Sequence, residues 1–240
     1  MTAQELIGHR VPVLDKGWIE LHDLMGDDLA IVNAARVSFL GESKGSERDK
    51  KLLFYLLKHQ HTSPFEMVEF KFRVRAPLVT WWQWVRHRTF HYQSVNSQSG
   101  RYTPFQEDDF YLPEVWRLQA QDNKQASEGV LEGPDGEELT RDLLAFYERG
   151  YQLYQKALEK GVAREMARLF LPGFAVYYTW IVKVDAHNLL HFLRLRMADD
   201  AQYEIRAYAT AIYHHFLRPA LPWTAEAFER YMLKNEESAG

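Results

Sequence analysis

The run Arg86-His87-Arg88 is the first group in this sequence whose residue types suggest chemistry. It lies in a window, residues 70–106, with six Lys and Arg residues and no Asp or Glu, although the whole chain is net acidic, with 29 Lys and Arg against 33 Asp and Glu. A guanidinium group binds two oxygens of a phosphate or carboxylate at once. Aromatic residues are interleaved with these charges. The window therefore predicts a site for an anionic ligand with a flat ring, such as a nucleotide, a flavin or a nucleic acid.

A polar loop follows this run and ends in Ser99-Gly100-Arg101-Tyr102. It is rich in short donors and acceptors, among them Ser97 and Gln98, which suit phosphate oxygens and the imide edge of a pyrimidine. On the Arg-His-Arg run alone, a solvated helix end is an equally good interpretation, because cations favour helix C-termini. The composition of the loop favours a ligand site.

Other histidines and arginines are further candidates. His187 and His191 are one helical turn apart and could hold a metal, but no third ligand is evident, so we expect packing or stacking on a ligand. The segment from His61 to Glu66, with Ser63 and Pro64, is either a simple helix-to-strand turn or part of a site. Arg164, Arg168, Arg194 and Arg196 form a later cationic group.

Several function classes are excluded or disfavoured. The chain has no Cys, which excludes disulfides, thiolate metal sites and Cys nucleophiles. It has no Gly-rich phosphate loop and no nucleophile elbow. Its acidic total charge disfavours a non-specific nucleic-acid binder. The N-terminus lacks the apolar core of a signal peptide and no apolar run reaches membrane length, so we expect a cytoplasmic protein.

The pattern of elements predicts one domain over residues 1–240, either α+β or a mixed sheet flanked by helices. Phe65 to Ala76 is the clearest strand, because apolar and charged residues alternate along it. Pro77 then opens a helix to about Arg88, which would place Gln83 and Arg86 within one turn of His87. We expect extended segments at 11–14 and 18–24, helices at 28–38, 46–59, 139–160, 163–171, 201–217 and 224–234, and a solvated polar excursion at 107–138. Residues 174–184 predict a central strand covered on both faces, followed by a helix that Asp185 caps and that runs to about Arg196.

Taken together, these motifs resemble the flavin-dependent thymidylate synthases. The likeness rests on Arg-His-Arg followed by Ser-Gly-Arg-Tyr and continues over nearly the whole chain. It includes Leu14-Asp15-Lys16-Gly17, Ala34-Ala35-Arg36-Val37-Ser38, His61-Thr62-Ser63-Pro64-Phe65-Glu66, Arg164-Glu165-Met166-Ala167-Arg168 and Ala201-Gln202-Tyr203-Glu204. The spacer Thr89–Gln98 is longer than is usual in the family, so we expect it to bulge.

The resemblance implies that the chain makes dTMP from dUMP, with methylenetetrahydrofolate as carbon donor and FAD, reduced by NADPH, as hydride donor. It also implies a twisted, mainly antiparallel sheet flanked by helices, in a homotetramer whose active sites draw residues from several subunits. A route through a Cys thiolate is closed to this chain, whereas a reduced flavin does not need one.

The resemblance also implies roles for particular residues. Arg196 matches the arginine that polarises the uracil, and a fixed cation there would stabilise negative charge on the ring. The implied flavin contacts are His61, Ser63, Glu66, Arg86, His87, Arg88, Ser97, Asp185, His187 and His191. The implied dUMP contacts are Gln83, Arg86, Ser97, Gln98, Ser99, Gly100, Arg101, Arg168 and Arg196. We expect Ser99 to position substrate rather than to act as a nucleophile, since no adjacent base is evident.

Two other function classes remain open from the residues alone. The basic, aromatic window could bind RNA or single-stranded DNA. The histidine pair could belong to a metallohydrolase, which would contain bound metal. A flavin absorbance spectrum of the purified protein would favour a flavin-dependent thymidylate synthase over both of these classes.

Overall fold

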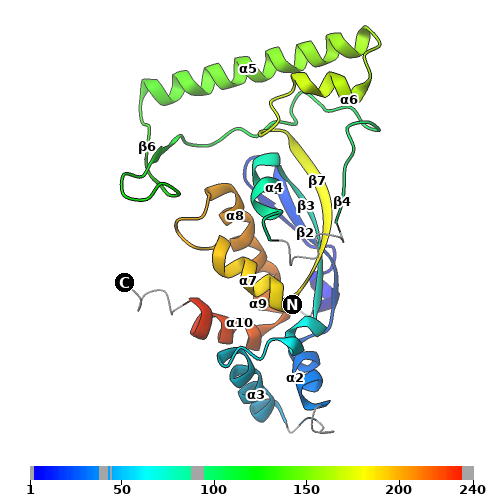
Figure 1. Cartoon of the computed structure of the whole chain (residues 1–240), viewed down its shortest axis with the longest axis vertical. Coiled ribbons are helices and arrows are strands. Elements are labelled where there is room, and N and C mark those ends of the chain that lie inside the picture. The colour runs from blue at the N-terminus through cyan, green and yellow to red at the C-terminus, as the bar shows by residue number, and fades with distance from the viewer. Residues whose placement is uncertain (1–2, 38–42, 44, 88–94, 234–240) are drawn as a thin grey trace.

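A five-stranded antiparallel sheet organises the computed structural model, which describes residues 3–37, 43, 45–87 and 95–233 (Figure 1). Its strand order is β1-β2-β3-β7-β4, with every neighbouring pair antiparallel. The strands are β1 (Arg10–Val13), β2 (Gly17–Met25), β3 (Glu69–Pro77), β4 (Val95–Ser97) and β7 (Tyr177–Asp185). The α+β architecture with an antiparallel sheet flanked by helices is therefore confirmed, whereas the described strands do not form the alternative, a sheet that mixes parallel and antiparallel strands.

One face of the sheet packs against helices. In β3, Phe70, Phe72 and Val74 are fully buried, whereas the alternating Lys71 and Arg75 keep partial exposure. The helices on the buried side are α1 (Ala3–Leu6), α2 (Asp28–Val37), α3 (Ser46–Lys58), α4 (Leu78–Trp84), α7 (Ala186–Arg196), α8 (Tyr203–Ile212), α9 (Arg218–Ala220) and α10 (Pro222–Phe228). Residues 213–217 and 229–233 form π-helical turns after α8 and α10. This side contains most of the apolar core.

The other face of the sheet is only partly covered within one protomer. We expected β7 to be a central strand buried on both faces. It does lie between β3 and β4, and Trp180, Val182 and Val184 are buried. Ile181 and Lys183 on the opposite face are only half-buried, so the prediction of full burial is wrong for the single chain.

A second, smaller core lies beneath α5 (Pro134–Glu159), the long helix that crosses one end of the molecule (Figure 1). Its buried members are Phe105, Phe110, Tyr147, Tyr154, Ala157, Ala167, Leu171 and Val176. The short helix α6 (Arg164–Ala167) packs against α5, and a 3-10 turn at 168–170 follows it. Helices α2 and α3 lie at the opposite end of the molecule (Figure 1). Among the described residues, no helix has the length and apolar character to cross a membrane.

The predicted solvated excursion is wrong over its first residues. Phe110 and Tyr111 are buried, and Asp109 pairs with Arg75 of β3 at 2.8 Å. The hairpin of β5 (Arg117–Gln119) and β6 (Ser127–Val130) follows. The polar composition of this segment gave no indication that Phe110 and Tyr111 are buried.

Two predicted boundaries also differ. The strand begins at Glu69 rather than Phe65, because residues 63–67 form a 3-10 turn with Pro64 in its first positions and Phe65 in the core. Helix α4 ends at Trp84 rather than Arg88, where the N–H of His87 donates to the carbonyl of Trp84 at 3.0 Å in a tight turn. The turn aims His87 toward α7.

The Leu14-Asp15-Lys16-Gly17 motif anchors the 108–112 segment to the sheet. The Asp15 carboxylate accepts from the Tyr177 hydroxyl at 2.5 Å and from the N–H of Leu112 at 3.1 Å. Lys16 Nζ donates to main-chain carbonyls of the same segment. Gly17 is required here, because a Cβ would lie 2.0 Å from the Tyr208 hydroxyl oxygen. This motif therefore holds the scaffold together.

Candidate active site

Three of the predicted site residues meet where the turn after α4 faces the end of α7. Arg196 is the last residue of α7, and its Nε donates to His87 Nε2 at 2.7 Å. Its Nη1 donates to Gln83 Oε1 at 3.2 Å, and its Nη2 to the main-chain carbonyl of Gln83 at 3.3 Å. We call Gln83, His87 and Arg196 the inner cluster. All three nitrogens of the guanidinium group thus donate to His87 or Gln83, and neither of these residues carries a negative charge.

The electrostatics of the inner cluster keep the imidazole neutral. Burial, followed by the charges of Arg196 and His191, lowers the pKa of His87 to about 4. A neutral imidazole has a free lone pair on Nε2, which the Arg196 N–H needs as its acceptor. Burial also lowers the pKa of Arg196. At neutral pH the cluster therefore presents one oriented positive charge.

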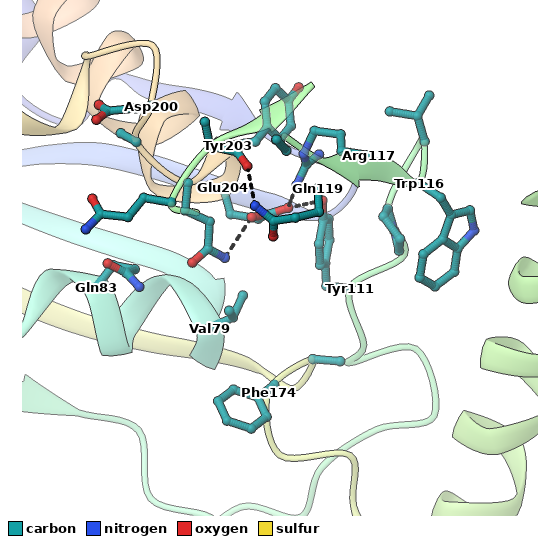
Figure 2. Close-up of a pocket in the computed structure, with 18 of the residues that line it drawn as sticks. Val79, Gln83, Tyr111, Trp116, Arg117, Gln119, Phe174, Asp200, Tyr203 and Glu204 are labelled. Atoms are coloured by element: carbon teal, nitrogen blue, oxygen red, sulfur yellow. Dashed lines mark hydrogen bonds and ion pairs between the residues drawn. The ribbon is translucent and has the colours of Figure 1, made fainter. Parts of the chain in front are cut away.

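A pocket of about 940 Å³ opens beside the inner cluster and is lined on one side by Gln83 and Arg196. Figure 2 shows Gln83 on α4 and the side chains of Tyr111, Arg117 and Glu204 around the same space. The β5–β6 hairpin and the start of α8 form the other walls. Of the predicted site residues that the structure describes, only Gln83 and Arg196 line this pocket.

A buried carboxylate forms the polar floor of the pocket. Glu204 accepts from Arg117 Nη2 at 2.5 Å, from the Tyr111 hydroxyl at 3.1 Å and from Gln202 Nε2 at 2.9 Å. Burial alone would raise the pKa of Glu204, but the bonds from Gln202 and Arg117 outweigh it and lower that pKa. Arg117 also stacks over Tyr203, 4.5 Å from the ring centre. No sequence motif pointed to Arg117, because it lies in the segment that we expected to be solvated.

A second group of predicted residues surrounds the Ser99 loop. The Ser99 carbonyl accepts from the N–H of Tyr102 and Thr103, and its Oγ accepts from the N–H of Arg101 at 3.3 Å. Arg164 Nη1 on α6 donates to the carbonyls of Arg101 and Tyr102, at 3.1 and 2.8 Å. The loop is therefore a compact turn tied to α6.

Gly100 and the arginines complete this group, which we call the outer cluster: Ser99, Gly100, Arg101, Arg164 and Arg168. A Cβ on Gly100 would lie 2.6 Å from Cε2 of the buried Phe105, so only glycine fits. Arg101 and Arg168 are exposed, and the Arg168 Nε bonds only to the carbonyl of Glu165 on its own turn. Gln98 and Ser97 lead into the loop along the edge of β7, where Gln98 exchanges hydrogen bonds with Thr179.

The remaining predicted flavin contacts lie elsewhere. His61, Ser63 and Glu66 are exposed around the 3-10 turn that packs against α2 and α7. His187 and His191 are half-buried on α7, and the rings of His191 and His87 are 6.1 Å apart. Arg86 is exposed, and Arg88 lies outside the described residues.

Asp185 has a structural position. It is buried, and its carboxylate caps α7 by accepting from the N–H of Asn188 at 2.8 Å, while its second oxygen accepts from the Asn188 side chain. The predicted cap is thereby confirmed. The flavin contact that the resemblance implies for Asp185 stays a prediction.

The single chain therefore assembles part of the predicted site. Between described residues, no hydrogen bond, ion pair or ring contact joins the inner cluster to the outer cluster or to His61, Ser63 and Glu66. Helix α6 lies at one end of the molecule and the 63–67 turn near α2 at the other (Figure 1). No group of three or more His, Asp or Glu in the described part of the chain is arranged to hold a metal ion.

Comparison with known proteins shows which family the chain resembles over nearly its whole length. The family model described as "Thymidylate synthase complementing protein" matches residues 20–223. A flavin-dependent thymidylate synthase of Thermus thermophilus is 50% identical over 224 residues, covering 93% of this chain and 80% of that protein. One from Thermosipho africanus is 42% identical over 228 residues, covering 93% and 96%.

A solved structure is similar as well. The UMP/dUMP methylase PolB from Streptomyces cacaoi, bound with 5-Br UMP, superposes with a TM-score of 0.80 at 31% identity, covering 92% of this chain and 98% of that one. Sequence and fold thus agree over nearly the whole length. The chain belongs to the flavin-dependent thymidylate synthase family.

Proposed function

We propose that this protein converts dUMP to dTMP, using methylenetetrahydrofolate as the carbon donor and NADPH-reduced FAD as the hydride donor. The names of the relatives support flavin-dependent thymidylate synthesis, and PolB is described as acting on UMP and dUMP. The observation that carries the proposal is Arg196, a half-buried cation that Gln83 and His87 hold beside a large pocket.

Arg196 stabilises negative charge on the uracil ring. Adding a carbon at the nucleophilic ring position requires electron density to build up on the ring and its carbonyl oxygens. A positive charge that is already oriented stabilises that density without reorganisation during the reaction. Neutral partners suit this role, because a carboxylate in the place of Gln83 or His87 would cancel the field of the guanidinium.

His87 is a positioning residue in this scheme. Its neutral Nε2 accepts from Arg196 and fixes the tilt of the guanidinium plane. If His87 were protonated, Nε2 would become a donor and two cations would face each other. The lowered pKa of His87 prevents this at neutral pH.

The chain also offers groups that fit a flavin. Arg86 is exposed and has no carboxylate partner among the described residues, so its guanidinium is available to a phosphate. The imidazoles of His187 and His191 lie one turn apart on α7, and burial lowers the pKa of His191, so that a neutral ring faces the cofactor. Ser63 and His61 on the 3-10 turn add further polar contacts. When bound and reduced, the flavin supplies a hydride, a role for which no Cys is needed.

The outer cluster binds the phosphate of dUMP in this proposal. The guanidiniums of Arg101 and Arg168 are exposed, and neither has a carboxylate partner in the described part of the chain. Arg101 is part of the turn around Ser99 and Gly100, and Arg168 lies one helical turn beyond Arg164, which donates to the carbonyls of that turn.

Self-association would bring the two clusters together. Met166, Leu169 and Phe170 flank Arg168 and are 54%, 72% and 47% exposed, which is a large apolar surface for a single chain. We infer that another subunit covers this surface in a homotetramer and that the outer cluster of one protomer completes the inner cluster of its neighbour. The cytoplasmic location stays a prediction.

The direct test is a coupled assay with the purified protein. We expect release of tritium from 5-tritiated dUMP and oxidation of NADPH, both dependent on methylenetetrahydrofolate and both increased by added FAD. NADH in place of NADPH and omission of the folate serve as controls. Absence of tritium release from a flavin-loaded protein would contradict the proposal.

A further inference from the structure

A groove separate from the pocket beside Arg196 runs along the outside of α3. Its volume is about 470 Å³, and it lies between α3 and the turn 229–233 that follows α10. Helices α3 and α10 pack against each other at the end of the molecule far from α5 (Figure 1). None of the residues that line it belongs to the two clusters described above.

The groove is positively charged in a chain that is net acidic. Among the residues that the structure describes, those that line it include Lys50, Lys51, Lys58 and Arg230, against one carboxylate, that of Glu47. Lys51 pairs with Glu47 at 2.8 Å, and Lys50 pairs with Glu226 at 2.6 Å. Within the described residues, Lys58 and Arg230 have no carboxylate partner. The described residues around the groove therefore leave the positive charges of Lys58 and Arg230 without a neutralising carboxylate.

One wall of the groove is aromatic and leads to a predicted cofactor residue. Tyr55 is 52% exposed, and its ring centre is 4.4 Å from His59 and 5.8 Å from His61. His61 is one of the flavin contacts in the proposed function. Lys51, Tyr55 and Lys58 have i, i+4, i+7 spacing, so they share one face of α3. A ligand that extends from His61 into the groove would therefore contact both flat rings and cationic side chains.

We propose that this groove binds the γ-glutamyl tail of the folate co-substrate. This inference rests on the proposed function, because it extends the same active site outward along α3. A folate has an aromatic head and a flexible tail with one carboxylate for each added glutamate. Tyr55 and His59 match the aromatic part, and Lys58 and Arg230 match the carboxylates. The residues of the groove thus select for longer tails without contacting the reacting atoms.

The test compares methylenetetrahydrofolate with one and with five glutamates. Exposed ion pairs each contribute modestly, so several together give the wild type a KM roughly tenfold lower for the pentaglutamate. The double variant Lys58→Glu/Arg230→Glu should lose this preference while keeping its KM for the monoglutamate and for dUMP. Raising the salt concentration should reduce the preference of the wild type, because it screens exposed charges.

Controls separate this inference from the proposed function. Lys156→Glu reverses an exposed charge on α5 and should keep the preference. Turnover of the monoglutamate alone tests the proposed function. Binding of fluorescent penta-γ-glutamate, measured by anisotropy, tests the groove even in a protein that does not turn over.

Three results would overturn the inference. The wild type could show the same KM for both folates, or the double variant, shown to be folded by circular dichroism, could keep the full preference. Alternatively, the double variant could raise the KM for NADPH alone. That result would assign the groove to the phosphate of a dinucleotide.

Discussion

The inner and outer clusters hold their arginines in opposite ways. Arg196 is half-buried, and its guanidinium is fixed by Gln83 and His87. Arg168 is exposed, and its guanidinium bonds only to a carbonyl on its own turn. The first arrangement suits a cation that must be oriented before the reaction. The second suits a cation whose partner arrives from outside the protomer, either as ligand or as a neighbouring subunit.

The largest expected effect is the loss of the oriented cation. Arg196→Ala should reduce dTMP formation by about 1,000-fold, because a preorganised charge that stabilises a transition state contributes that much when removed. Flavin binding should be spared, as measured by visible absorbance of the purified variant. Full turnover by Arg196→Ala would refute the role assigned to this residue.

Loss of an outer arginine should affect binding more than chemistry. Arg168→Ala removes one charge-assisted contact to the phosphate, so we expect the KM for dUMP to rise roughly 10- to 100-fold with a smaller change in kcat. Arg168→Lys should recover part of the affinity. An unchanged KM for dUMP would remove Arg168 from the phosphate site.

The shape of the outer loop should depend on Gly100. In Gly100→Ala the new methyl group would press on the Phe105 ring, which is buried against Tyr154 and Tyr178. We expect a loss of about 1–3 kcal/mol in the free energy of unfolding, together with weaker dUMP binding. Urea denaturation measures the first effect and isothermal titration the second. Ser99→Ala, which removes one weak bond of the same loop, is the matched control and should lose less.

The inner cluster should make stability depend on pH. The pKa of His87 is about 4 in the folded chain, against about 6.5 for an unperturbed histidine. Between pH 4 and 6.5, His87 is therefore protonated in the unfolded chain but neutral in the folded chain. The contribution of the neutral His87 to the free energy of unfolding is therefore fully present above about pH 6.5. It is lost as the pH falls toward 4, which lowers the free energy of unfolding by on the order of 2 kcal/mol.

Urea denaturation across this pH range tests the effect. In His87→Gln the free energy of unfolding should change less between pH 4 and 6.5 than in the wild type. The remaining pH dependence should include a contribution from His191, whose pKa is also lowered. An unchanged slope in His87→Gln would show that His87 is protonated in the folded chain.

Local patterns in the sequence predicted much of the fold but little of the geometry within the site. Alternation identified β3, and the Asp185 cap identified the start of α7, because both signals come from neighbouring residues. The start of β3 was misplaced because Phe65 continues the apolar pattern although it belongs to a 3-10 turn. Phe110 was missed because the charges around it dominate the composition of its segment.

The contacts of the site join residues that are distant in the chain. His87 and Arg196 are 109 positions apart, and Arg117 and Glu204 are 87 positions apart, so no local pattern could reveal either pair. The family resemblance supplied the identities of Gln83, His87 and Arg196 but not their mutual hydrogen bonds. It gave no account of Arg117.

Mixed assemblies of two variants that are each impaired at a low dUMP concentration, below the raised KM of Arg168→Ala, test most directly whether neighbouring subunits share one site. Arg196→Ala and Arg168→Ala subunits would be unfolded together, refolded as a mixture and assayed for tritium release. If each site takes Arg196 from one subunit and Arg168 from another, the mixture should recover roughly a quarter of wild-type activity, since some sites then contain both arginines. A mixture that assembles into mixed oligomers but shows no more activity at this dUMP concentration than the two variants assayed separately would contradict the account.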